Sequence, residues 1–471
     1  MLAPDEKPIP ASGETLSTAQ SSVPPAEGGT LSGRMREPLG GPVLFALFLA
    51  IGLIAFGYVW MTVLHRSVET LSSADLPNRA HTILSRWLNH GFFASYGLIW
   101  PTPDEKIIYR SFTGGFMVSG FLAEKVWIAM TGKYSWRLLA LHNEILALLI
   151  STLLALLAYR LARRFDAEPL HAFVLGVAVQ TVWFTFPDNV AGFWRVSEHE
   201  YSLLFSIGFL LLEERALDGR RRRLLTILQA LAIFALSYIE YLIGMMFIAS
   251  YIAAVLLLRE ERPPLKRLVA VLLLPWACAF TIYGIELIGA RTESKRTGVK
   301  VEGSSFLYRS GLDGDSMFYG NHLDIAFGRD IVRTGRPGNS QYLFRWEWLF
   351  IGGVASVLAT LAAFVRGKVP RIAVVTLAAL IGTYLLYAAV FSQAVALHPY
   401  LFDVLLATPM ILVLFAILPA LVESRTRHTG AIVSMALFGA VWLSMFQLRL
   451  YALCYPLPQP AASIIGTTNR H

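Results

Sequence analysis

The stretch that decides the fold covers residues 138–164 and reads LLALHNEILALLISTLLALLAYRLARR. Its apolar run extends over 138–159, and three arginines then end it, at Arg160, Arg163 and Arg164. An α-helix needs about 20 mainly apolar residues to cross the hydrocarbon core of a bilayer. Arginine next to such a run favours the cytoplasmic side. The stretch therefore predicts a membrane-spanning helix whose C-terminal end lies in the cytoplasm.

The composition extends this conclusion to most of the chain. The 471 residues are 55% hydrophobic and only 15% charged, and the mean hydropathy is +0.55. A soluble domain usually has about a quarter of its residues charged, so much of this surface must face something other than water. We expect an all-α polytopic membrane protein.

The net charge of +8 does not indicate a nucleic-acid partner. Much of the basic excess falls in short turns between apolar runs, where it orients the spans and favours anionic headgroups. The lipid bilayer is therefore the expected partner. The two cysteines form no disulfide framework, since Cys278 lies in an apolar run and Cys454 lies near the C-terminus. Cys278 is expected to be a small core residue.

Basic clusters also follow four other apolar runs. These are Arg215 and Arg220–Arg223 after 201–212, Arg259–Arg267 after 241–258, Arg366–Arg371 after 347–365, and Arg425 and Arg427 after 400–422. If all five clusters face the cytoplasm, the spans alternate consistently. The total is then about eleven transmembrane helices. The remaining spans fall near 42–64, 170–186, 224–239, 268–289, 372–391 and 431–447.

The rest of the chain divides into two tails and two large loops. Residues 1–41 are rich in proline, serine, glycine and alanine and predict a disordered cytoplasmic tail. The transmembrane domain covers 42–450, and residues 451–471 form an extracytoplasmic C-terminal tail. The two large extracytoplasmic loops cover about 65–136 and 290–345.

One segment of the first loop, 111–131, is moderately apolar but contains Glu124 and Lys125. If this segment crossed the membrane, the cluster that begins at Arg160 would lie outside. We therefore expect a helix that lies at the membrane interface.

Polar residues gather at the predicted extracytoplasmic ends of the spans. Asp75 follows the first span and precedes a predicted amphipathic helix over 78–90. It could cap that helix or act as a general base. Glu200 belongs to a turn that reads PDNVAGFWRVSEHEY over 187–201, and the next residues enter the bilayer directly. A carboxylate at that position is costly unless it is paired or catalytic.

The second loop is rich in arginine and lysine, and a mixed solvated surface explains most of it. Its arginine forks also suit the phosphate of a lipid in the outer leaflet. No Walker loop and no GxGxxG sequence is present. The HExxH pattern that begins at His199 has Leu203 in place of its second histidine, so it is not a zincin site. Whether a divalent metal ion takes part stays open.

Together these features resemble the GT-C superfamily of membrane glycosyltransferases, in particular the branch with protein O-mannosyltransferases and lipid A aminoarabinose transferases. An acid, Asp75, follows the first span, although the family often has two adjacent acids there and Leu76 follows here. The segment TGKYSWRLLALHNEILALL is similar to the run by which the family's first large loop enters the next span. The other matching residues are Gly132, Ser135, Arg137, Leu138, Asn189, Arg195, Glu200, His398, Tyr400 and Pro409.

The resemblance implies a GT-C-like fold and a glycosyltransferase that uses a polyprenyl-phosphate-linked sugar as donor. The sugar would be transferred with inversion, on the extracytoplasmic face of a bacterial inner membrane, to an envelope acceptor that is a glycan, a lipid or a protein. Asp75 and Glu200 would be the catalytic acids. The substrate-binding residues would be Arg79, Arg137, Arg195, His398 and Tyr400.

Other classes of protein remain open. A polymerase or ligase of lipid-linked glycans also has many spans and a large outer loop, but it does not need an acid after the first span. A transporter or flippase usually shows internal repeats and charges near the bilayer midplane. No repeat is seen here and the polar residues gather at one face, which favours an enzyme. A structural subunit of a cell-envelope complex is a further alternative.

Overall fold

A computed structural model gives the fold of the chain from Gly41 onward, with gaps. The residues it describes are 41–61, 75–95, 97–98, 107–109, 114–185, 198–216, 222–258, 263–302, 346–391, 405–423, 436–437, 439–441 and 443–444. The predicted tails therefore lie outside the described residues, apart from Gly41, and so does most of the second predicted loop.

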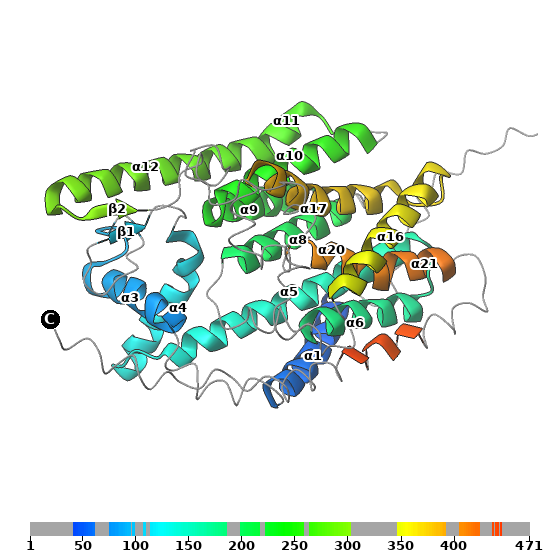
Figure 1. The fold of residues 1–471 in the computed structure, drawn as a ribbon, viewed down its shortest axis with the longest axis horizontal. Helices are drawn as coiled ribbons and strands as arrows, with labels where there is room; N and C mark the ends of the chain where they lie inside the picture. The colour runs from blue at the N-terminus through cyan, green and yellow to red at the C-terminus, as the bar shows by residue number, and fades with distance from the viewer. Residues whose placement is uncertain are drawn as a thin grey trace, which may run out of the picture. The chain divides into compact units, whose positions relative to one another are not determined.

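Helices occupy the positions of all predicted spans except the last, which is described only in part (Figure 1). They are α1 (Gly41–Val59), α5 (Trp136–Arg164), α6 (Pro169–Thr185), α8 (Glu198–Ala216), α9 (Arg222–Ile239), α10 (Tyr241–Leu258), α11 (Leu265–Leu268) with α12 (Leu274–Thr297), α16 (Trp346–Val365), α17 (Arg371–Val390), and α20 (Ala407–Leu412) with α21 (Leu418–Glu423). Within the described residues, five helices are long and apolar enough to cross a membrane. They are Gly41–Val59, Leu141–Arg164, Tyr241–Leu258, Leu265–Thr297 and Arg371–Val390. The architecture is all-α and has the helices of a multi-pass membrane protein.

Two apolar helices, one long and one shorter, contain a π-helical turn, and a proline explains each turn. The turns are Val269–Leu273, between α11 and α12, and Val413–Ile417, between α20 and α21. Pro275 and Pro419 each follow their turn by two residues. A proline has no N–H to donate, and its ring crowds the carbonyl four residues earlier. A locally wider turn relieves that crowding, so each helix continues past its proline.

α5 lies at the centre of the packing and contacts α1, α6 and α8. Its contact with α1 depends on Gly52. A Cβ added there would lie 2.6 Å from Leu148 Cδ1 and 2.7 Å from Gln180 Nε2. The same Gln180 Nε2 donates a hydrogen bond to the Phe48 carbonyl at 2.9 Å. Small residues that let backbones approach closely are a common way for membrane helices to associate.

The arginine-rich ends of several helices meet at one end of the bundle. Arg160 Nη1 and Arg164 Nη2, in the last turns of α5, lie 2.8 Å and 2.7 Å from the Glu214 carboxylate near the end of α8. Arg267 Nη2, in α11, lies 2.6 Å from Oε2 of the neighbouring Glu213. Three of the predicted basic clusters thus share one side, which we call the arginine-rich end.

The first helix also begins at the arginine-rich end, because a Cβ added at Gly41 would lie 3.7 Å from Arg160 Nη2. The opposite end, which we call the loop end, holds α3 (Asp75–His90) and α4 (Val118–Thr131), seen at the left of Figure 1. It also holds a two-stranded parallel sheet of β1 (Ile107–Tyr109) and β2 (Lys300–Glu302). This sheet joins the first predicted loop to the second. That the loop end is extracytoplasmic stays a prediction.

The expectation that Cys278 is a core residue is wrong. Cys278 is exposed on α12, and the same helix exposes Phe280, Ile285 and Ile288. An apolar helix in a membrane protein can turn apolar side chains toward either lipid or protein. The apolar run therefore could not show which way the thiol points.

Candidate functional site

The helix that begins at Asp75 is fixed to the loop end by one apolar face. The predicted amphipathic helix over 78–90 is confirmed, and it begins at Asp75. Ile83, Leu84 and Trp87 are buried. Trp87 Nε1 donates a hydrogen bond to the Leu98 carbonyl at 2.9 Å, and α3 packs on α4. The apolar face of α3 is thus packed on α4.

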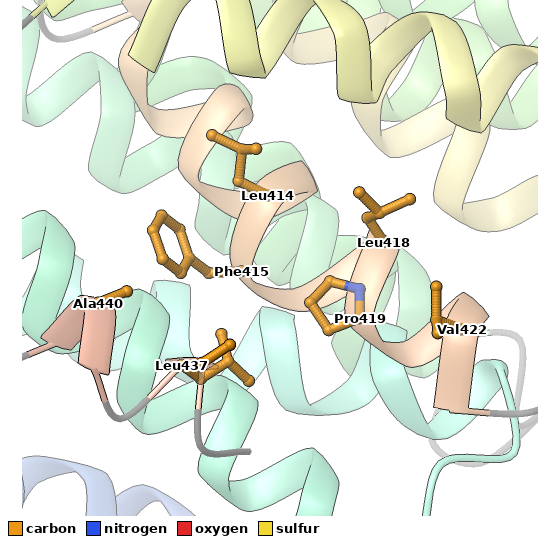
Figure 2. A pocket seen from close by; sticks show the side chains of 8 residues that line it. Leu414, Phe415, Leu418, Pro419, Val422, Leu437 and Ala440 are labelled. Atoms are coloured by element: carbon orange, nitrogen blue, oxygen red, sulfur yellow. The ribbon is translucent and has the colours of Figure 1, made fainter. Parts of the chain in front are cut away.

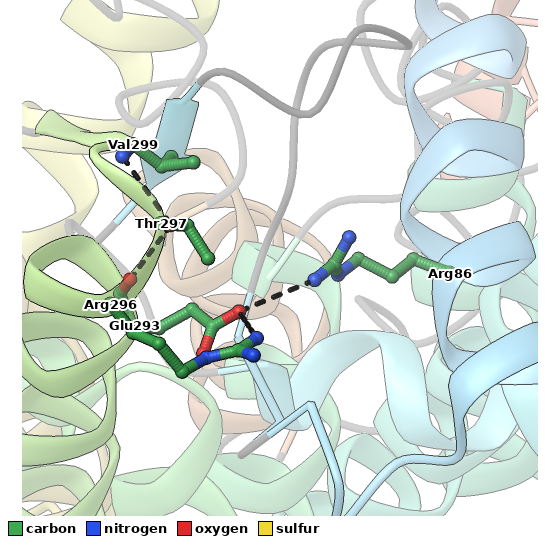
Figure 3. A network of polar contacts seen from close by, with 5 residues as sticks. All are labelled: Arg86, Glu293, Arg296, Thr297 and Val299. Carbon is green, nitrogen blue, oxygen red and sulfur yellow. Dashed lines mark hydrogen bonds and ion pairs between the residues drawn. The ribbon is translucent and has the colours of Figure 1, made fainter.

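An ion-pair network joins α3 to the loop end of α12 (Figure 3). Glu293 accepts hydrogen bonds from Arg296 Nε at 3.0 Å and Arg296 Nη2 at 2.7 Å. Arg86 Nη2, in α3, lies 3.8 Å from the same carboxylate. The Thr297 hydroxyl donates to the Glu293 carbonyl at 2.7 Å and accepts from the Val299 N–H at 3.4 Å. This network holds the helix that follows the first span against the helix that leads into the second loop.

Three polar side chains from α4, α5 and α8 meet at the loop end. Ser119 Oγ lies 2.5 Å from Tyr201 OH and 3.0 Å from His142 Nε2. Tyr201 OH lies 3.1 Å from the same nitrogen. His142 is six residues into α5, roughly 9 Å from its start at the usual helical rise. The group therefore lies one to two helical turns inside the loop end.

The tautomer of His142 is set by the next residue. His142 Nδ1 lies 3.1 Å from Asn143 Oδ1. An amide oxygen can only accept, so Nδ1 carries the proton. In a neutral imidazole this leaves the lone pair on Nε2, which faces the Ser119 and Tyr201 hydroxyls. The imidazole is thus oriented to receive a proton from a hydroxyl group.

Buried carboxyl groups stand on the same three helices. Glu124, Glu144 and Glu200 are 0%, 1% and 4% exposed. Glu124 Oε2 accepts the Ser135 N–H at 3.2 Å. Among the described residues, the other Glu124 oxygen and both Glu144 oxygens have no hydrogen-bond partner. A carboxylate that is charged and buried in this way costs roughly several kcal/mol of free energy, unless it is protonated or paired with a cation or a hydrogen-bond donor.

Glu124 lies on α4, outside the predicted spans, and its environment changes its acidity. Burial raises the pKa of its carboxyl group, and the hydrogen bond from Ser135 opposes that rise. Burial and the neighbouring Glu124 also raise the pKa of Tyr134. Both groups are therefore held toward their neutral forms.

Of the predicted site residues, the structure describes the side chain of Glu200 alone. Asp75 and Arg79 belong to α3 and Arg137 to the first turn of α5, but their side chains lie outside the described part. Arg195, His398 and Tyr400 also lie outside the described residues. Glu200 is buried at the start of α8, next to Tyr201.

Sequence reasoning missed Ser119, His142 and Tyr201. One signal was available for His142, because His142, Asn143 and Glu144 interrupt the apolar run of 138–159 with three consecutive polar residues. Polar residues inside a span usually face the protein interior and serve a function. No comparable signal marks Ser119 or Tyr201.

An apolar cavity of about 270 Å³ is a different kind of feature. Figure 2 shows it between α21 with the preceding π-helical turn and the short described segments near residue 440. Its lining is Leu414, Phe415, Leu418, Pro419, Val422, Ala436, Leu437 and Ala440. Such a lining suits hydrocarbon and offers no group for chemistry.

Metal ligands and known relatives do not define the site further. Among the described residues, no group of three or more His, Cys, Asp or Glu side chains could hold a metal ion. No protein-family model, no curated protein and no solved structure matches the chain. The functional argument therefore rests on the residues at the loop end.

Proposed function

We propose that the protein is a membrane glycosyltransferase that moves a sugar from a polyprenyl-phosphate donor to an envelope acceptor. The observation that carries the proposal is that α4 contacts both helices that hold a predicted catalytic acid in their first turn. α4 packs on α3, which begins at Asp75. Its Ser119 contacts Tyr201, the residue after Glu200. α4 thus connects two elements that are far apart in sequence, at the loop end of the bundle.

The chemistry follows from the residue types. A carboxylate, Asp75, takes the proton of the acceptor hydroxyl as that oxygen attacks the anomeric carbon of the sugar. The bond between this carbon and the phosphate oxygen breaks, and the configuration inverts. The cationic residues Arg79, Arg137 and Arg195 stabilise the negative charge on the leaving polyprenyl phosphate. Glu200 supplies the second acid.

The site lies on the extracytoplasmic side of a bacterial inner membrane in this proposal. Lipid-linked donors present their phosphate at the membrane surface, within reach of helix ends. The long apolar helices support a membrane location, and the arginine-rich end, which arginine favours in the cytoplasm, supports an extracytoplasmic loop end. His398 and Tyr400 complete the predicted substrate-binding residues.

Donor turnover by the purified protein tests the function. The protein is reconstituted in proteoliposomes with a panel of polyprenyl-phosphate-linked hexoses, pentoses and aminosugars, and the release of polyprenyl phosphate is measured. The proposal predicts release from at least one donor above the rate of protein-free liposomes. No release from any member of the panel, with folded protein, would contradict it.

A further inference from the structure

We propose that Ser119 is an activated nucleophile and that Ser119, His142 and Asn143 form an acyl-transfer site for an ester of a membrane lipid. This activity goes beyond the proposed glycosyl transfer, which does not use these three residues. The proposal rests on the hydrogen-bond geometry of the loop end and on the apolar surface of α4.

The geometry is that of a nucleophile, a base and an orienting group. Ser119 Oγ lies 3.0 Å from His142 Nε2, and His142 Nδ1 lies 3.1 Å from Asn143 Oδ1. Asn143 keeps the Nδ1 proton in place, so Nε2 is free to accept the serine proton. Tyr201 OH lies 2.5 Å from Ser119 Oγ. A phenol at this position can donate a hydrogen bond to the oxyanion that forms on the attacked carbonyl.

In an acyl-transfer site the orienting group is buried, whereas the nucleophile and the base must be open to the substrate. Asn143 is 1% exposed and its Nδ2 has no hydrogen-bond partner among the described residues. Ser119 and His142 are only partly buried. The orienting group is therefore fixed inside the protein, whereas the residues that hold the nucleophile and the base are partly exposed.

The surface of α4 points to lipid as the source of the ester. Leu122, Val126 and Met130, four residues apart, are exposed along one face of the helix. The helix has 14 residues, a length of roughly 21 Å. That is shorter than the bilayer core of about 30 Å. A short helix with an exposed apolar face is typical of the membrane interface, where lipid ester carbonyls lie. Ser119 is in the first turn of this helix.

The reaction balances without a further reagent. Ser119 Oγ forms a bond to the ester carbonyl carbon as its proton moves to His142 Nε2. The bond from that carbon to the alkoxy oxygen then breaks, and the leaving alcohol takes the proton from Nε2. Water or a second alcohol attacks the acyl-serine by the same proton route. The products are a carboxylic acid or a new ester, and Ser119 is regenerated.

Labelling with a fluorophosphonate probe tests the proposal. This probe phosphonylates activated serines and needs no sugar donor, so its outcome is independent of the glycosyltransferase assay. The detergent-purified full chain is labelled, and the modified peptide of the wild-type protein is mapped by mass spectrometry. We expect the label on Ser119. The variant His142→Ala should slow the labelling by about 10²–10⁴-fold.

The matched control is Ser151→Ala. Ser151 is also a serine on a membrane-spanning helix, α5. Its hydroxyl donates a hydrogen bond to the Leu148 carbonyl at 2.9 Å rather than to an imidazole. Labelling should be unchanged in this variant and absent in Ser119→Ala. Absence of label in the wild type, label on another residue, or equal labelling in His142→Ala would each overturn the proposal. The wild-type peptide map does not depend on the folding of any variant.

Discussion

Replacement of Glu214 by leucine should strongly destabilise the arginine-rich end. The Glu214 side chain is 6% exposed and lies 2.8 Å from Arg160, which is 7% exposed. Removing one partner of a buried ion pair leaves an uncompensated buried charge and costs about 3–5 kcal/mol. Arg164 also loses its ion pair with Glu214, but its side chain is 28% exposed and partly solvated. We therefore expect a loss near the lower limit, about 3 kcal/mol.

The assay is equilibrium unfolding in mixed micelles with increasing dodecyl sulfate, followed by circular dichroism. Glu168→Leu is the matched control, because the Glu168 side chain is 73% exposed; its effect should stay within about 0.5 kcal/mol. Adding Arg160→Met to Glu214→Leu should recover part of the loss, since the uncompensated charge is removed as well. Equal stability of Glu214→Leu and Glu168→Leu would refute the reasoning.

Three further predictions concern the loop end and the core. Reporters that are active only after export should be active when fused after residues 100 and 320. Activity of a cytoplasmic reporter at either point would contradict the predicted topology. Because burial raises the folded-state pKa of Glu124, the folded state is penalised as pH rises above the usual glutamate value of about 4.3. Glu124→Gln should therefore unfold at a higher temperature than the wild type at pH 7 and at the same temperature at pH 4; a lower value at pH 7 would contradict this. Gly52→Ala places a Cβ 2.6 Å from a leucine methyl group of α5, so it should cost about 1–3 kcal/mol in the same unfolding assay, whereas Gly57→Ala, with nothing within 4 Å, should not.

The helices could be predicted from the sequence because an apolar run of sufficient length has few alternatives in a bilayer. The run 138–159 and its arginines located α5, and the same pattern located the other helices. The amphipathic helix over 78–90 was predicted correctly from its apolar spacing, but it begins at Asp75, three residues earlier than expected. In such a chain, sequence patterns predict where a helix lies more readily than which side of it faces protein or lipid. The exposed Cys278 shows this.

The polar group at the loop end could not be predicted because it is a product of packing. Ser119 and His142 are 23 residues apart, and Ser119 and Tyr201 are 82 apart. Their contact depends on how α4, α5 and α8 lie against one another, which no local pattern records. The catalytic assignments of Asp75 and Glu200 remain predictions, since they came from a resemblance and from the cost of a carboxylate at a membrane boundary.

Donor turnover by two isosteric variants tests the central claim most directly. The claim is that the loop end, where α3 and α8 begin, performs the glycosyl transfer. Asp75→Asn and Glu200→Gln remove a carboxylate with little change in shape, and Asn caps a helix as well as Asp. Each variant should fold and should release polyprenyl phosphate about 10²–10⁴-fold more slowly than the wild type. Glu168→Gln, at the exposed turn before α6, should leave the rate unchanged. Wild-type rates in both loop-end variants would contradict the account.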